Sequence, residues 1–289
     1  MNLFTPGEIT KNAVEIGVKK ANLPLNNMLI LAILAGAYIA FAAEVSTMIT
    51  HDASSFLGAG VARLLSGAIF SVGLMLVVIC GAELFTGNCL LIIGVLEGKI
   101  TSSQMFRNWA IVFSANFIGA LLVVFLMKES GLWGANGFLH GVAAVKTAAA
   151  KIDMTFSQAF ARGILANWLV CLAVWMAYAS KDYVGKVVGI FFVITAFVAS
   201  GFEHSIANMY FIPAGIFAKT IPAVVQAGGL APELLASLTW QSFIYKNLIP
   251  VTLGNIVGGV LFVGMAYWSV FLQEEKTAPI FVFAKKLKA

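Results

Sequence analysis

The chain has 289 residues, of which 60% are hydrophobic and only 11% are charged. Soluble globular proteins have about 45–50% apolar and about 25% charged residues, so water cannot be the main solvent of this surface. Continuous apolar runs favour membrane-spanning helices over a transmembrane barrel, whose strands alternate in polarity. The net charge of +5 requires no nucleic acid partner, and the three cysteines match no metal or disulfide spacing.

The first element expected is a short amphipathic helix over 5–20. Thr5 suits the N-cap, Pro6 suits the first helical position, and Glu8 completes a capping box. One apolar face predicts a helix that lies on the membrane surface, although an ordinary cytoplasmic helix has the same pattern. We therefore expect residues 1–26 to form an amphipathic cytoplasmic segment.

Six apolar stretches follow, each long enough to span a bilayer, which takes about 20 residues. They lie at 27–48, 61–95, 107–127, 157–180, 185–218 and 247–272. The second and fifth are too long for one pass and hold polar residues at their centres. We expect both to be interrupted helices, with Gly81 and Gly201 at the interruptions.

An even number of spans places both termini on the same side of the membrane. Most Lys and Arg residues fall on that side, which favours cytoplasmic termini. The expected organisation is a six-span channel domain over 27–273 and a cytoplasmic basic tail over 274–289.

The two halves of the chain carry an internal repeat. The pattern G-x-E-x-x-x-x-N occurs at 81–88 and again at 201–208, and N-x7-N-x2-G starts at Asn108 and again at Asn247. A shorter match, Ile-Leu-Ala, precedes them at 33–35 and 164–166. A repeat of three spans must enter the membrane from opposite sides. Such inverted repeats place a transport site at the midplane, between paired interrupted helices.

Each interruption carries its own acid and amide. Unpaired backbone groups in hydrocarbon cost several kcal/mol each, so an interrupted helix needs internal partners. We expect Glu83 and Glu203 to cap freed backbone N–H groups. Polar support is also expected from the asparagines Asn116, Asn208 and Asn255. The alternative, two bare carboxylates lining a pore, would imply cation transport.

His204 is the most informative single residue because it lies inside an interruption where a span should be apolar. Intramembrane ionisable residues are candidates for function, and histidine can exchange a proton near neutral pH. Its repeat counterpart is Leu84. Thr86 is the candidate partner of His204 across the pseudo-axis, or else satisfies its own loop. His51 and His140 fall in predicted external loops and are expected to be solvated.

Four motifs, at 81–86, 167–175, 200–208 and 247–255, resemble the signatures of the formate/nitrite transporter family. The similarity runs from about residue 5 to 273. The resemblance implies an all-α integral membrane protein with an aquaporin-like six-span protomer. It also implies a homopentamer with one pore per protomer, and passage of formate, nitrite or hydrosulfide.

The resemblance also implies roles for individual residues. The family's pore histidine corresponds to His204, its pore-loop threonine to Thr86 and its vestibule lysine to Lys151. Its bracing asparagines correspond to Asn167 and Asn255. The apolar constrictions correspond to Phe70, Leu74, Leu84, Val170 and Phe197. The histidine pair that often follows the vestibule lysine in formate channels is missing here, where Asp153 and Met154 stand instead.

These observations together predict a channel for small monovalent weak-acid anions in the bacterial inner membrane. Helix N-termini and Lys151 would attract the anion, and His204 would protonate it transiently so that it crosses apolar constrictions as a neutral molecule. Formate is the first expectation, followed by nitrite or hydrosulfide. The alternatives are a proton-coupled anion symporter and an aquaporin-like neutral-solute channel, although the Asn-Pro-Ala motif is absent. No nucleophile triad, metal cluster or cofactor motif indicates an enzyme.

Overall fold

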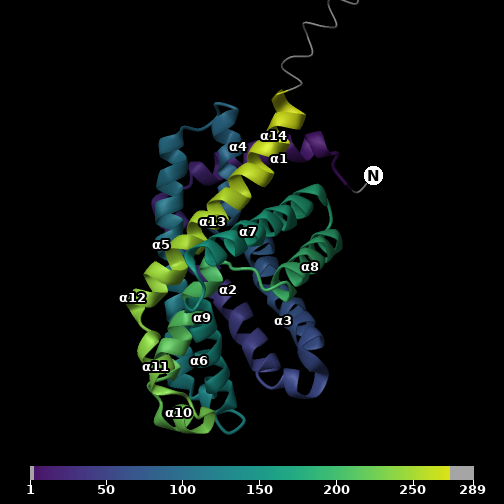
Figure 1. Cartoon of the computed structure of the whole chain (residues 1–289). Coiled ribbons are helices and arrows are strands. Elements are labelled where there is room, and N and C mark those ends of the chain that lie inside the picture. The colour runs from purple at the N-terminus through teal and green to yellow at the C-terminus, as the bar shows by residue number, and fades with distance from the viewer. Residues whose placement is uncertain (1–2, 274–289) are drawn as a thin grey trace, which may run out of the picture.

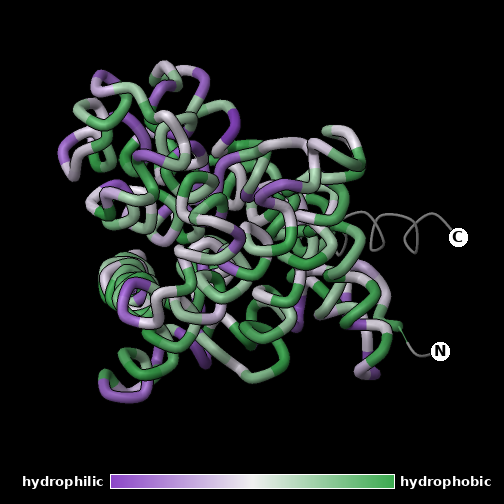
Figure 2. The backbone as a smooth tube through the Cα atoms, turned by 90° about the horizontal axis from the view of Figure 1, so that it is seen from below, coloured by the Kyte–Doolittle hydropathy of each residue, from purple (hydrophilic) through white to green (hydrophobic). Residues whose placement is uncertain are grey.

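The computed structural model describes residues 3–273, so the predicted basic tail at 274–289 lies outside the described residues. Within residues 3–273 the regular structure is helical, and the only β contact is an isolated bridge between Leu3 and Ser180. The expectation of an all-α membrane protein is confirmed. Hydrophobic residues run along most of the helical trace (Figure 2).

The first half of the chain contains a surface helix, three long helical segments and one interruption. Its elements are α1 (Pro6–Ala21), α2 (Leu25–Thr50), α3 (Ala53–Ile79), the 3-10 turn η1 (Gly87–Leu90), α4 (Leu91–Leu96) and α5 (Ser102–Ser130). The break between α3 and η1 falls at the interruption predicted in the second span. However, α3 alone has 27 residues, because its helix begins at Ala53, before the expected start of that span.

The second half has the same order of elements with longer connections. Its elements are η2 (Leu132–Gly134), α6 (Leu139–Ile152), α7 (Phe156–Ala179), α8 (Tyr183–Ala199), α9 (Ser205–Ala218), α10 (Pro222–Gly228), α11 (Pro232–Ser237), α12 (Trp240–Ser242), η3 (Phe243–Leu248), α13 (Ile249–Gly259), η4 (Val260–Met265), α14 (Ala266–Trp268) and η5 (Ser269–Gln273). The elements from α12 to η5 form one continuous 34-residue helix with α and π stretches.

Within residues 3–273, five helices are long and apolar enough to cross a membrane: α2, α3, α5, α7 and the helix from α12 to η5. The predicted fifth span corresponds to α8, which has 17 residues, followed by a break and α9. α9 continues into α10 through a bend of 96°. Many large apolar side chains on the long helices are exposed, which is what a surface in contact with lipid requires.

The two halves run in opposite directions through the bundle. In Figure 1, α1 and α4 lie at one end of the molecule, and their counterparts in the second half, α6 and α9, lie at the other. In this arrangement α3, which precedes the first interruption, packs along α8, which precedes the second. The predicted inverted repeat is therefore confirmed.

In each repeat, one glycine allows the backbones of two neighbouring helices to come into direct contact. A Cβ on Gly119 would overlap the carbonyl oxygen of Ile33, and a Cβ on Gly258 would overlap that of Ile164. α5 thus lies directly against α2, and α13 against α7, as in other membrane helices that meet through small residues. These pairs form the rigid frame around the two interruptions.

The amphipathic helix predicted at the N-terminus is α1, and it begins with the expected capping box. Thr5 donates its backbone N–H to the Glu8 carboxylate at 2.7 Å and accepts the Glu8 N–H on its hydroxyl. These hydrogen bonds from Thr5 hold the pKa of Glu8 below its ordinary value. The cap fixes where α1 starts and therefore where Lys20, near its end, is delivered.

Candidate functional site

Both interruptions begin with a glycine in the left-handed region, Gly81 at φ 76° and Gly201 at φ 74°. Side chains other than glycine rarely adopt this conformation, so each glycine ends its helix sharply and turns the chain. The helix α3 therefore stops at Ile79 and α8 at Ala199, leaving short non-helical segments inside the bundle. Their backbone groups need partners because no water reaches them through the lipid.

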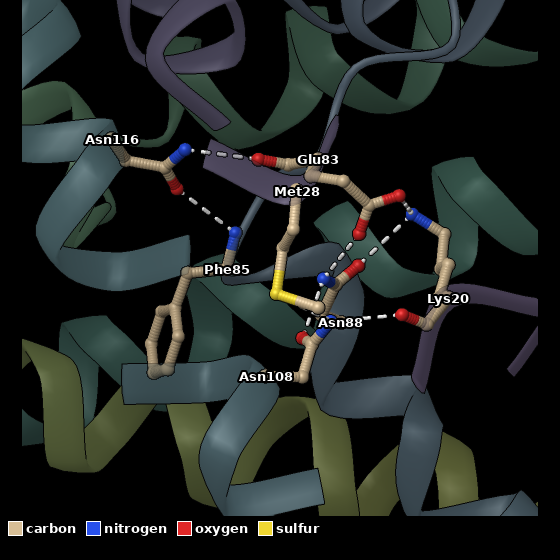
Figure 3. Close-up of polar contacts among 7 residues, drawn as sticks. All are labelled: Lys20, Met28, Glu83, Phe85, Asn88, Asn108 and Asn116. Atoms are coloured by element: carbon tan, nitrogen blue, oxygen red, sulfur yellow. Dashed lines mark hydrogen bonds and ion pairs between the residues drawn. The ribbon is translucent and has the colours of Figure 1, made fainter. Parts of the chain in front are cut away.

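In the first half, Asn116 on α5 supplies those partners (Figure 3). Its side-chain oxygen accepts the N–H of Phe85 at 3.0 Å, and its NH₂ group donates to the carbonyl of Glu83 at 2.9 Å. A third bond, to the carbonyl of Ala32 at 2.7 Å, ties the loop to α2. One amide thus satisfies both sides of the interrupted backbone.

Asn255 on α13 makes the equivalent contacts in the second half. Its oxygen accepts the N–H of Ser205 at 2.9 Å, and its NH₂ donates to the carbonyls of Glu203 at 3.0 Å and Gly163 at 2.8 Å. Both asparagines are fully buried. A satisfied buried amide fixes loop geometry more strictly than apolar packing can, because each lost bond leaves an unpaired polar group.

The carboxylates of Glu83 and Glu203 do not cap freed backbone N–H groups, as the sequence predicted, but bind other side chains. Within residues 3–273 the Glu83 carboxylate accepts bonds from side chains, Lys20 at 2.7 Å and Asn88 at 2.7 Å, and not from backbone N–H groups (Figure 3). Asn88 also donates to Asn108 at 2.8 Å. The prediction that the acids cap freed N–H groups is wrong, because asparagines already fill that role. Each acid instead anchors a lysine.

Glu203 repeats this network with Lys151, which donates to it at 2.9 Å. Asn208 donates to Glu203 at 2.7 Å and to Asn247 at 2.7 Å. The lysine that the resemblance places at a vestibule is therefore held in an ion pair, and its Nζ lies 5.1 Å from the centre of the Phe211 ring. Its side chain remains 15% exposed.

Lys20 is a site residue that the sequence reasoning missed. Its contacts with Glu83 mirror those of Lys151 with Glu203, so each half delivers a lysine from the helix that precedes its first span. The signal was present in the sequence. The Ile-Leu-Ala match at 33 and 164 sets a register, and the same register pairs Lys20 with Lys151.

A narrow apolar cavity of about 10 Å³ lies between the two interruptions. This is about the space of one water molecule. It brings together all the constriction residues that the sequence analysis named, together with His204 and two further side chains. The lining residues are Ile39, Phe70, Leu74, Leu84, Val170, Ile194, Phe197 and His204. Ile39 and Ile194 are the two that sequence reasoning missed.

The lining of the cavity follows the repeat. In the registers set by the repeated motifs, Leu74 is paired with Ile194, and Leu84 with His204. Ile39 is paired with Val170 in the same way. The pseudo-twofold axis therefore passes through the cavity. These three pairs form a symmetric, apolar part of the wall, in which one half contributes an imidazole where the other contributes a leucine. Phe70 and Phe197 have no counterpart on the wall, because the same register pairs them with Ile190 and Val77.

Hydrogen bonds determine which ring nitrogen of His204 carries the proton. The N–H of Ala207 donates to Nδ1 at 3.2 Å, so Nδ1 carries a lone pair, and Nε2 lies 2.8 Å from the Thr86 hydroxyl. In the neutral ring Nε2 therefore carries the proton and donates it to Thr86. The ring is 3% exposed. The structure thus brings Thr86 to His204, although Thr86 is not on the cavity wall.

The backbone beneath Thr86 is held by Asn167 and Cys171 of α7. Asn167 donates to the carbonyl of Thr86 at 3.2 Å and to that of Asn255 at 2.7 Å. Cys171 lies 3.5 Å from the same Thr86 carbonyl oxygen. Asn167 thereby connects the first interruption to the helix that braces the second.

A wider cavity opens on each side of the narrow one. At the α1 end, a cavity of about 190 Å³ is lined by Lys20 and by Leu74 and Leu84, which it shares with the narrow cavity. At the other end, a cavity of about 310 Å³ is lined by Phe211. Phe70 separates the two spaces, with its ring centre 6.4 Å from that of Phe211 and 6.2 Å from that of Phe197.

The described residues thus form an apolar constriction with one histidine, and a wider cavity lies towards each end of the molecule. No group of three or more His, Cys, Asp or Glu side chains within residues 3–273 could hold a metal ion. An inverted repeat with paired interrupted helices around such a constriction defines a membrane transport protein. The sequence matches the family model described as Formate/nitrite transporter over residues 7–269, so the chain belongs to the formate/nitrite transporter family.

Relatives match this chain over almost their full length. It is 43% identical to the "Probable formate transporter" of Methanothermobacter thermautotrophicus, over 93% of this chain and 98% of that protein. It is 42% identical to the "Formate channel FocA" of Escherichia coli strain K12, over 94% of this chain and 96% of that protein. The solved structure of a "Pentameric formate channel with formate bound" is 40% identical and superposes with a TM-score of 0.78, covering 86% of this chain and 98% of that one.

Proposed function

We propose that this protein is a channel for formate and related small monovalent weak-acid anions, including nitrite and hydrosulfide. The observation that carries the proposal is the placement of a single neutral imidazole, His204, in an apolar constriction with a lysine–glutamate pair on each side of it, Lys20–Glu83 and Lys151–Glu203. The names of its relatives support formate as the first substrate.

The two lysines give the vestibules their attraction for anions. Lys20 and Lys151 are each paired with a glutamate, so neither of these two ammonium groups is a bare charge. A paired ammonium still keeps donor capacity, since it has three N–H groups. An arriving carboxylate can therefore bind a lysine without first breaking the lysine–glutamate pair, and the binding stays weak enough for the anion to move on.

The constriction is a barrier to charged solutes. A solute can cross it only if it is neutral or if hydrogen bonds from the protein replace its lost hydration. An anion that enters a dry apolar cavity loses its hydration, which costs far more than any single hydrogen bond returns. His204 can supply compensation at Nε2, where the N–H that now serves Thr86 would serve the anion instead. Because formate, nitrite and hydrosulfide are bases of weak acids, a proton received at this point would remove the charge altogether.

Full proton transfer requires an imidazolium, and the geometry makes that state costly. A proton on Nδ1 would face the N–H of Ala207, so that bond would be lost and a buried donor left unsatisfied, at a cost of about 1–3 kcal/mol. His204 therefore rests in the neutral form and becomes charged only when an anion is close enough to stabilise it. This restricts proton transfer to the loaded channel.

Assembly and orientation belong to the same proposal. The solved relative is a pentameric channel, and the exposed apolar faces of the long helices are compatible with contacts between copies as well as with lipid. We propose a homopentamer of protomers, each with its own pore, in the bacterial inner membrane. The charge bias favours cytoplasmic termini, with residues 1–26 at that face, 27–273 as the channel and 274–289 as a basic tail.

Uptake into proteoliposomes tests the proposal. Labelled formate should enter vesicles that contain the protein and should be competed by nitrite and hydrosulfide, with chloride as the control anion that cannot be neutralised by a proton. Swelling measured with glycerol tests for a neutral-solute pore. Formate uptake no faster than in protein-free vesicles, with rapid glycerol entry, would contradict the proposal.

A further inference from the structure

Three polar side chains from three different helices meet away from the constriction. The Tyr210 hydroxyl on α9 donates to Oε2 of Glu44 on α2, and Nε2 of His140 on α6 lies 3.0 Å from Oε1 of the same carboxylate. His140 was expected to be solvated in a loop, and this is wrong, because it is fully buried within α6. Tyr210 is 1% exposed.

The contacts of His140 determine how many protons the cluster holds. Its Nδ1 lies 3.1 Å from the carbonyl oxygen of Leu132, which can only accept, so Nδ1 carries a proton. Among the described residues Nε2 has no aligned hydrogen-bond partner, but its 3.0 Å contact with Oε1 of Glu44 requires one further proton, either on the imidazole or on the carboxyl group. Glu44 and His140 therefore share one proton, and its loss would leave a carboxylate facing a lone pair.

The cluster sits beside the edge of the pore. Tyr210 directly precedes Phe211, whose ring stacks on Phe70 of the constriction and lies under the Lys151 ammonium. The same helix carries His204 at its N-cap. Because the Tyr210 hydroxyl is bonded to Glu44 across the helix interface, it fixes the rotation of α9 against α2 and so fixes where Phe211 points.

Other titratable groups face the cluster from one side. The ring centre of His51 lies 6.0 Å from that of His140, and His51 is itself 3.9 Å from the Asp52 carboxylate. His51 and Lys146 both line the 310 Å³ vestibule cavity, on whose wall Phe211 also lies. His51 therefore lies between His140 and the vestibule cavity, with its Nδ1 bonded to the carbonyl of Met48 and its Nε2 bonded to Asn136.

We propose that Glu44, His140 and Tyr210 form a one-proton lock that positions Phe211 at the edge of the pore. While the proton is shared, the three helices are tied and Phe211 stays packed on Phe70. When the proton is lost at alkaline pH, the Glu44 carboxylate and the His140 lone pair repel each other, so Glu44 moves away from His140. Tyr210 stays bonded to the carboxylate and moves with it, so that α9 turns and Phe211 can leave Phe70. This inference rests on the proposed function, since it concerns the regulation of the same pore.

Two substitutions distinguish the effect of the proton held by Glu44 and His140 from the effect of the Tyr210–Glu44 hydrogen bond. In Glu44→Gln, the amide can donate to neutral His140 and accept from Tyr210, so the lock is closed without a titratable proton. Tyr210→Phe keeps the ring but removes the bond that holds α9. Glu129→Gln, an exposed carboxylate at the end of α5, is the matched control. Size-exclusion chromatography verifies that each variant assembles as the wild type does.

The experiment measures labelled formate flux in proteoliposomes with the same pH on both sides, over a range from neutral to alkaline. We expect wild-type flux to rise by about threefold or more relative to Glu44→Gln as the pH increases, with Glu129→Gln following the wild type. Tyr210→Phe should show the raised flux already at neutral pH. If Glu44→Gln and Tyr210→Phe both follow the wild-type profile while formate is transported, the lock is overturned and the proposed function stands.

A readout independent of transport tests the lock if formate is not carried. Hydrogen–deuterium exchange at the Cε1 position of His140, followed by mass spectrometry, gives the midpoint of its titration. We expect that midpoint to fall by about one pH unit or more in Glu44→Gln, because the carboxylate no longer supports the shared proton. An unchanged midpoint would overturn the lock, whereas a shifted midpoint without formate flux would overturn the proposed function alone.

Discussion

Thr86 Oγ1 and His204 Nε2 lie 2.8 Å apart, although the two residues are 118 positions apart in the chain. This bond joins the two interruptions and is the direct link between the halves of the repeat at the pore. The Thr86 hydroxyl accepts the hydrogen bond of the Nε2–H group at rest, so a substrate that binds this N–H must displace the hydroxyl. Thr86 is therefore expected to set how readily His204 turns toward the anion.

Replacing Thr86 by Val removes the hydroxyl and keeps the shape of the side chain. The His204 N–H then loses its partner in a buried site, at a cost of about 1–3 kcal/mol, and the ring no longer has a fixed orientation. We expect formate flux to fall by about tenfold in Thr86→Val. Thr86→Ser retains the hydroxyl and should keep most of the flux. Equal flux in the two variants would show that the bond has no part in transport.

The ion pair between Lys20 and Glu83 should contribute measurably to stability. Glu83→Gln leaves the Lys20 ammonium without its carboxylate in a site where the two side chains are 22% and 5% exposed. We expect a loss of about 2–3 kcal/mol in the free energy of unfolding in detergent, less than for a fully buried pair. The control is Glu129→Gln, whose partner Lys128 is 4.0 Å away at the surface, with an expected change within about 0.5 kcal/mol. Similar losses in both variants would contradict the role given to the network.

The close contact of α5 with α2 depends on Gly119. In Gly119→Ala the added methyl group would overlap the Ile33 carbonyl, so α5 and α2 must separate and the bond from Asn116 to the Ala32 carbonyl must stretch. We expect a loss of about 2 kcal/mol or more in stability and little assembled protein on size-exclusion chromatography. Gly60→Ala is the control because a methyl group there meets no atom within 4 Å. A stable, transport-competent Gly119→Ala protein would show that the frame tolerates separation.

The symmetry of the constriction predicts the effect of moving its histidine. Leu84 and His204 are repeat counterparts on opposite walls of the same cavity. In the double variant Leu84→His/His204→Leu the new imidazole lacks both partners of His204. The N–H of Ala207 faces residue 204 from its own helix, and the Thr86 hydroxyl faces residue 204 from the first interruption. We expect formate flux to stay at least about tenfold below the wild type, measured in the same proteoliposomes. Wild-type flux in the swapped protein would mean that any imidazole in the cavity is sufficient.

Much of this architecture could be predicted from the sequence because each motif occurs twice, and two weak matches in the same order support each other. The Gly and Asn patterns around 81 and 201 located both interruptions, and a shared register paired Leu84 with His204. Lys20 was missed, although the register that pairs residue 33 with residue 164 also pairs Lys20 of α1 with Lys151. Ile39 and Ile194 were missed because apolar residues on spans carry no individual signal.

His140 shows where sequence reasoning fails for a physical reason. The segment between the predicted third and fourth spans, 128–156, contains glycines and no apolar run long enough to span a membrane, so its composition favours a solvated loop. The chain instead folds it into α6, the inverted counterpart of α1, which packs against α9 and buries the imidazole. Its partner Glu44 lies on another helix, and no local pattern links the two. Likewise, the anchoring of Lys151 by Glu203 depends on tertiary contact and not on spacing.

The pH dependence of labelled formate flux through His204 variants in proteoliposomes tests the central role of this residue most directly. His204→Ala removes the imidazole, and His204→Asn keeps an N–H donor that cannot transfer a proton. We predict that His204→Ala loses at least about tenfold of the flux, and that His204→Asn retains part of it without the wild-type pH dependence. Wild-type flux with an unchanged pH profile in both variants would contradict the central role given to His204.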